Sequence, residues 1–267
     1  MENSVFNQLI TIVRFEFLKN LRRKRFFALL IVTLLIIILP HIITATFNIP
    51  YPEAAKIFAQ NSLNMIEMIL ILSVSMFAGD IISSEFDKRT GYVLMVNPVR
   101  REIILLGKFL SAALSTMIIL MIPYVSCIVG LVIIYGEIVN EIFLSLAYAI
   151  IYMVSLVGLA ILFSSLIKNS TLSIILTFLT LFLVMPILST VMVLTAHEPW
   201  FILTYCSGIV LQVFNPPKER VVEIKVGDTT FYQFYPDIAT SIMVMIGYTI
   251  ITVLLALIIL KTKELKD

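Results

Sequence analysis

The sequence predicts an all-α polytopic membrane protein with six transmembrane helices and both termini in the cytoplasm. The first observation is composition: 60% of the 267 residues are hydrophobic and 13% are charged, against about a quarter charged in a soluble domain. A soluble fold of this length cannot bury so much apolar surface, and disorder needs the opposite composition. The second observation is that the charges leave long bare stretches between them, and the third is that the basic residues are unevenly distributed among the connecting loops.

The bare stretches are long enough to cross a bilayer, which takes about 20 apolar helical residues. Five runs carry no Asp, Glu, Lys or Arg, and a sixth carries only Glu67 and Asp80, each near one end. We therefore expect a single transmembrane domain over residues 1–267, with spans at about 26–47, 63–83, 109–135, 142–167, 170–196 and 238–260.

The distribution of Lys and Arg sets the orientation, because cytoplasmic loops are enriched in them. With the N-terminus inside, fifteen of the 19 basic residues are cytoplasmic, and the exceptions are Lys56, Lys218, Arg220 and Lys225. The acidic residues divide evenly between the two sides, as expected of residues that contribute little to this rule.

The loop before the last span, residues 197–237, is predicted to be extracellular and to contain two structured pieces. Trp200–Phe214 is a further uncharged run of 15 residues, but as a helix it would reach only about 22 Å, so we expect it to be re-entrant or interfacial. Val221–Val226 and Thr229–Tyr235 flank a Gly227-Asp228 turn, a pattern typical of a β-hairpin. The hairpin could cap a pathway, contact an outer partner, or only plug the fold.

Residues 4–24 are predicted to form an amphipathic helix. Apolar residues recur at helical spacing, namely Phe6, Leu9, Ile10, Val13, Phe17 and Leu21, while a largely opposite face carries Arg14, Lys19, Arg22 and Arg23. Such a helix would lie in the membrane interface with its basic face toward anionic headgroups. The alternative is a charge cluster that only fixes the topology.

The most polar cytoplasmic segment is the loop at 84–107. Thr90-Gly91 interrupts its helical pattern, a short apolar piece follows at Tyr92–Val96, and Asn97-Pro98 is a good helix start. We expect a short helix parallel to the membrane that presents Tyr92, Leu94 and Met95. Exposed apolar side chains ringed by charges indicate a docking site.

The pattern of Glu85, Gly91, Asn97-Pro98-Val99, Arg101 and Leu106-Gly107-Lys108 resembles the cytoplasmic signature of type-2 ABC transporter permeases. It is similar in particular to the branch of bacterial and archaeal exporters, multicopper-enzyme maturation systems and antibiotic exporters. The resemblance implies a permease subunit of an ATP-driven exporter in a prokaryotic cell membrane. It would form the substrate pathway with a second copy or a similar permease, and two separate ABC ATPase subunits would drive it.

The resemblance also implies which residues couple to the ATPase. In the family, the short helix after the break docks into a cleft on the ATPase, so the coupling role is carried onto Glu85, Asp87, Arg89, Thr90, Gly91, Tyr92, Val93, Leu94, Met95, Asn97, Pro98 and Arg101. This sequence departs from many relatives in having no acidic residue within the short helix.

The chain lacks the sequence patterns of a catalytic subunit. It has no G-x-x-x-x-G-K-[ST] phosphate loop, so ATP and Mg²⁺ are expected on the partner ATPase, and no cofactor is expected here. Its only histidines are His41 and His197, and no cluster has metal-ligand spacing. We predict no catalytic residue, no metal site and no nucleic-acid partner.

Three residues within spans are candidates for the pathway or its hinges. Glu67 is an acid within a span, and it could either snorkel to the interface or line a pathway. Pro123 and Pro186 can kink their helices. The alternatives to an ABC permease are a secondary transporter, which would call for midplane charges and inverted repeats, and a non-transporting membrane anchor or sensor.

Overall fold

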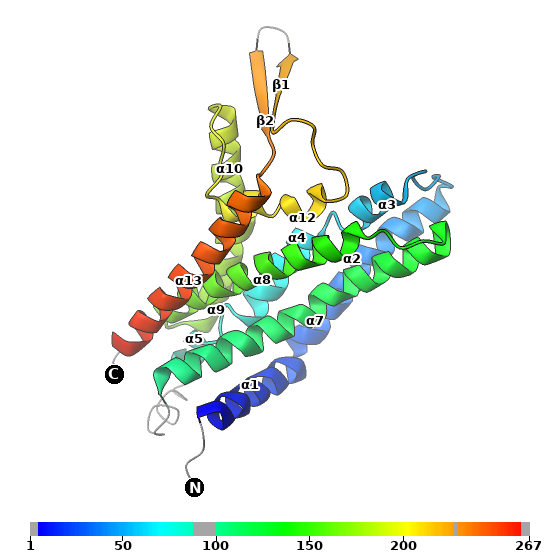
Figure 1. The fold of residues 1–267 in the computed structure, drawn as a ribbon. Coiled ribbons are helices and arrows are strands. Elements are labelled where there is room, and N and C mark those ends of the chain that lie inside the picture. The colour runs from blue at the N-terminus through cyan, green and yellow to red at the C-terminus, as the bar shows by residue number, and fades with distance from the viewer. Residues whose placement is uncertain (1–4, 88–99, 227–228, 263–267) are drawn as a thin grey trace.

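The computed structural model describes residues 5–87, 100–226 and 229–262. Its helices confirm the predicted fold class, because six of them are long and apolar enough to cross a membrane. They form an antiparallel bundle in which both ends of the described chain lie at the same end (Figure 1). We call this the termini end, and the opposite end, from which a β-hairpin projects, the hairpin end.

The chain enters the bundle through α1 (Val5–Arg22) and the first span α2 (Lys24–Thr46). The second span differs from its predicted bounds, because it is broken into α3 (Ala55–Ser62) and α4 (Ile66–Phe77). The sequence did not predict α3 as part of the span, because Lys56, Gln60 and Asn61 make it polar on one face. Its residues Phe58 and Ala59 are nevertheless buried. Asp80 lies beyond this span, in the turn before the short helix α5 (Ser83–Asp87).

The third span, α7 (Arg101–Tyr135), is a single helix of 35 residues that contains Pro123. It ends at Gly136, whose φ of 72° lies in the left-handed region that favours glycine. The fourth span is α8 (Glu141–Leu166).

The fifth span is interrupted by a π-helical turn. It comprises α9 (Ser170–Leu179), η1 (Thr180–Val184) and α10 (Met185–Leu194). Pro186 comes directly after this turn, and a π-bulge is one of the ways a helix accommodates a distortion of its hydrogen bonding. No residue of α10 is buried.

The segment Trp200–Phe214 folds into two short helices, α11 (Leu203–Cys206) and α12 (Ile209–Gln212). Together they are too short to cross a bilayer. The predicted hairpin is present as β1 (Val221–Val226) and β2 (Thr229–Phe234), paired antiparallel with Val221 opposite Phe234. The last span is α13 (Ile238–Thr262).

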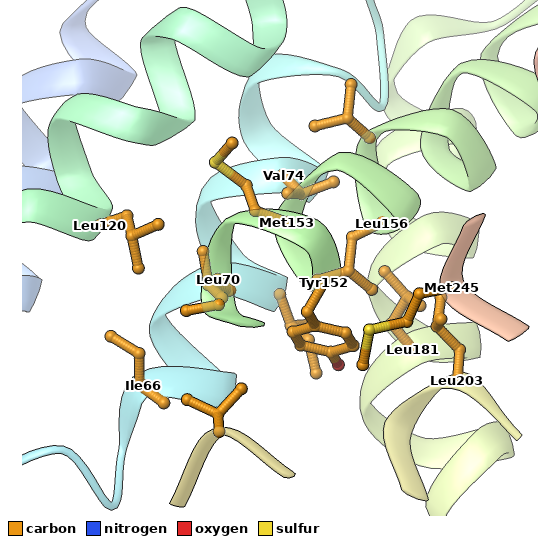
Figure 2. Close-up of a cluster of buried hydrophobic side chains, with 14 of the residues drawn as sticks. Ile66, Leu70, Val74, Leu120, Tyr152, Met153, Leu156, Leu181, Leu203 and Met245 are labelled. Atoms are coloured by element: carbon orange, nitrogen blue, oxygen red, sulfur yellow. The ribbon is translucent and has the colours of Figure 1, made fainter. Parts of the chain in front are cut away.

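The core lies where α4 and α8 meet. Figure 2 shows Leu70 and Val74 of α4 beside Tyr152, Met153 and Leu156 of α8. Several buried hydroxyls form hydrogen bonds within their own helices, as Ser73 does by donating to the carbonyl of Ile69 at 2.8 Å. This is how polar side chains are tolerated in a membrane bundle.

Candidate functional site

At the termini end, α1 lies along α7 and packs closely against it (Figure 1). The approach is close because residue 107 is glycine: a Cβ there would lie 2.6 Å from Cγ2 of Ile12. The face of α1 turned to the bundle is not purely apolar, since Glu16 and Asn20 are 3% and 1% exposed. Asn20 donates to the hydroxyl of Ser115 on α7 at 3.2 Å. The interfacial helix is therefore fixed to the third span.

Four charged side chains from three helices meet in this contact, and we call them the ion cluster: Glu16 and Lys19 of α1, Glu85 of α5 and Lys108 of α7. The Nζ atom of Lys108 lies 2.7 Å from Oε1 of Glu16 and 3.0 Å from Oε1 of Glu85. Lys19 Nζ lies 3.0 Å from Oε2 of Glu16 and 3.3 Å from Oε1 of Glu85. Each acid thus contacts both lysines.

The ion cluster is formally neutral and largely shielded from water. The side chain of Lys108 is only 3% exposed, and its third contact is the carbonyl of Ile81 at 3.0 Å. Burial raises the pKa of Glu16, but the ammonium groups of Lys108 and Lys19 outweigh this effect and hold the pKa below its ordinary value. Charges buried in this way are tolerated only when paired and hydrogen-bonded.

A second buried acid, Asp80, joins the α1–α2 junction to the turn after α4. Its carboxylate is 3.1 Å from Nη1 of Arg23 and 2.8 Å from Nη1 of Arg25. Together with the ion cluster, this contact fixes the segment that runs from α4 into residue 87 against the N-terminal part of the chain.

The N-terminus of α7 is attached to the last span. Nη1 of Arg101 donates to the carbonyls of Leu260 and Lys261, both at 2.7 Å. These carbonyls lie in the last turn of α13, where a cation interacts favourably with the helix dipole. Lys261 also pairs with Glu102, although both side chains are about half exposed.

The sequence matches the family described as ABC-2 family transporter protein over residues 10–265. The chain belongs to the ABC-2 family of transporter proteins. It is therefore a multi-pass membrane protein and the membrane component of an ABC transporter, as the resemblance of its 84–107 loop indicated. No curated protein matches the chain in a sequence search.

Most predicted coupling residues of this ABC-2 permease lie outside the described residues, namely Arg89, Thr90, Gly91, Tyr92, Val93, Leu94, Met95, Asn97 and Pro98. Of the other three, Asp87 is exposed at the end of α5, while Glu85 and Arg101 contact their own chain as described above. These two therefore attach the described residues on either side of 88–99 to the bundle.

The predicted interface residues fall into two groups. Phe6, Ile10, Arg14 and Arg22 are exposed, whereas Leu9, Val13 and Phe17 are half-buried. Lys19 and Arg23 were expected to face headgroups, but their nitrogen atoms pair with acids of the permease itself. The reason is that Glu16 precedes Lys19 by one turn of α1, while Glu85 and Asp80 approach these cations from the segment after α4.

Sequence reasoning did not single out Glu16 or Asp80, and it treated Lys108 only as part of a motif. One signal was available: Glu16 lies among the apolar positions of α1, where an unpaired carboxylate would be costly. Its most buried partner, Lys108, is however 92 residues away in the sequence.

Glu67 and the two prolines occupy distinct places in the permease. Glu67, in the first turn of α4 at the hairpin end, accepts a hydrogen bond from the Tyr152 hydroxyl at 3.4 Å. It lines two cavities of about 660 and 120 Å³. Pro123 lines a third cavity of about 270 Å³ together with Pro40 and His41, and Pro186 follows the π-helical turn. The described residues contain no group of three or more His, Cys, Asp or Glu that could hold a metal ion.

Proposed function

We propose that this permease is the membrane subunit of an ATP-driven exporter, with its termini end in the cytoplasm. Two ABC ATPase subunits would bind and hydrolyse ATP with Mg²⁺, and they would dock on the 84–107 loop. Two permease copies, or one copy and a similar permease, would flank the pathway, because six spans are few to enclose one. The scarcely packed α10 leaves apolar surface for lipid or for that second copy.

One observation carries this proposal: the described residues on both sides of 88–99 are attached to the bundle by contacts of charged side chains. On one side, Glu85 joins α5 to α1 and α7 through the ion cluster. On the other side, Arg101 joins the start of α7 to the end of α13. A segment that transmits force needs such attachments, because a loosely held loop would move without displacing the spans.

The coupling follows from thermodynamic linkage. ATP can change the state of the permease only if the ATP-bound form of the ATPase pair binds one permease conformation more tightly than the other. The ion cluster would then make α1, α5 and α7 respond as a unit when the loop is displaced. The pathway between the two permease copies would alternate between inward and outward states.

The test uses the loop itself in the purified complex with its ATPase. We expect Gly91→Val, or charged residues in place of Tyr92, Leu94 and Met95, to abolish stimulation of ATP hydrolysis by the permease while the complex remains folded. Gly247→Ala is the matched control, because nothing lies within 4 Å of a Cβ at that position.

Two results would count against the proposal. Loop variants with unchanged stimulation of the ATPase would show that coupling does not pass through residues 88–99. If no ATPase with a phosphate loop co-purifies in any of several mild detergents, a secondary transporter or a membrane anchor becomes the better interpretation.

A further inference from the structure

The hairpin end contains a cavity that the coupling mechanism does not use. It has a volume of about 660 Å³, within the range of small-molecule sites. It lies between the broken second span, the short helices α11 and α12, and the base of the hairpin. Its lining includes Gln60, Glu67, Thr204, Tyr205, Lys218 and Tyr235.

Glu67 is the unusual member of this lining. Its carboxylate lies in a membrane helix, where it accepts a hydrogen bond from the neutral hydroxyl of Tyr152 at 3.4 Å. No ion pair joins Glu67 to any Lys, Arg or His that the structure describes. Buried acids normally have a positive partner, and Glu16 and Asp80 of this chain follow that rule.

A second observation points independently to a ligand in the same cavity. Thr204 lines it and is 7% exposed, yet its hydroxyl oxygen is buried without a hydrogen-bond partner among the described residues. A buried hydroxyl left unpaired costs about 1–3 kcal/mol, so such groups usually meet a bound molecule or water. Thr204 comes from α11 and Glu67 from α4, so two separate elements border the cavity, one with a carboxylate that has no cationic partner and one with a buried hydroxyl that has no hydrogen bond among the described residues.

The remaining lining is suited to a positive group. Aromatic rings from Tyr205, Phe234 and Tyr235 border the cavity, and their faces attract ammonium groups when water is excluded. Lys218 is the one basic residue of the lining, and it is exposed, so its ammonium can remain in water while a ligand occupies the interior.

We propose that this cavity binds an ammonium-bearing ligand whose positive group pairs with Glu67 and donates to the hydroxyl of Thr204. The site goes beyond the proposed coupling function, because it lies at the opposite end of the bundle and requires no ATPase. A ligand here would connect α4 to α11 and to the hairpin, three pieces that are separate in sequence.

The test measures binding of benzylammonium to the purified full chain in lipid nanodiscs by calorimetry, with benzyl alcohol as the uncharged match. We expect saturable binding of benzylammonium alone. Glu67→Gln should weaken it about tenfold or more, which is the effect of losing a charged hydrogen bond. Lys218→Ala should tighten it, because a like charge is removed from the rim.

Equal binding of benzyl alcohol, unchanged affinity in Glu67→Gln, or weaker binding in Lys218→Ala would each overturn the proposal. A second measurement needs no variant and so does not depend on the folding of Glu67→Gln. A hydrophobic carbodiimide should modify Glu67 in the native chain, and mass spectrometry should show that benzyltrimethylammonium, which has no N–H to react with the activated carboxyl, slows this reaction whereas benzyl alcohol does not. Modification at the same rate with both compounds would also overturn it.

Discussion

Lys108 is the residue on which the ion cluster depends most, because it contacts both acids and is almost fully buried. Replacing it by Met, which is similar in length, leaves Glu16 and Glu85 with Lys19 alone. We expect a loss of about 3–5 kcal/mol in stability, the usual result of removing one partner from a buried ion pair. Thermal unfolding in detergent would measure it. Lys261→Met removes an exposed pair and should change the melting temperature little; equal losses in both variants would contradict the assignment.

Glu16 should make the docking of α1 dependent on pH. Its pKa is lowered in the folded protein, so the stabilisation is present above the ordinary value of 4.5 and is lost as the pH falls through the lower, folded value. Hydrogen exchange of α1 amides should therefore accelerate below that pH while α8 stays protected. The variant Glu16→Gln should lack this acid-dependent step, and a step of the same size in the variant would assign it to another group.

At the scale of the element, the fit between α1 and α7 depends on Gly107. A Cβ there would lie 2.6 Å from Cγ2 and 3.0 Å from Cβ of Ile12, and β-branched Ile12 has little freedom to move away. Gly107→Ala should thus destabilise the contact by about 1–3 kcal/mol. Adding Ile12→Ala should restore part of the loss. Gly247→Ala, made in open space, should be neutral or slightly stabilising, and a loss there as large as at Gly107 would show that packing against α1 is not the cause.

The contact between α7 and α13 gives a prediction of its own. Arg101→Met removes both hydrogen bonds to the last turn of α13. We expect faster hydrogen exchange at the end of α13, and transport reduced relative to ATP hydrolysis in the reconstituted complex. If transport and hydrolysis keep their ratio, Arg101 only stabilises the fold.

The whole molecule is expected to work as part of a larger assembly. Native mass spectrometry of the complex from its own cells should give two permease chains, or one with a similar partner, and two ATPase chains. A complex containing one permease and no relative of it would refute the pathway arrangement.

The extent to which the sequence predicts this molecule varies with the kind of interaction. The spans follow from the length of the uncharged apolar runs, and the hairpin follows from the alternation of apolar and polar residues around a turn. The structure contains both the spans and the hairpin. The break between α3 and α4 was not predicted, because Lys56, Gln60 and Asn61 give that stretch the composition of a loop. The ion cluster was not predicted either, since Glu16, Glu85 and Lys108 meet only after the helices have packed.

The length of α7 has a mechanical consequence. At 1.5 Å per residue its 35 residues extend about 52 Å, well beyond the roughly 30 Å hydrocarbon layer. In the proposed mechanism, such a helix would transmit a tilt imposed at Arg101 toward Tyr135 and the loop before α8, with Pro123 as the position at which it could bend. The neighbouring second span is interrupted at residues 63–65, so in that mechanism α4 would turn there without moving α3. Under the proposed mechanism, a continuous helix beside an interrupted one would turn a displacement at the termini end into a sliding motion between the two spans at the hairpin end.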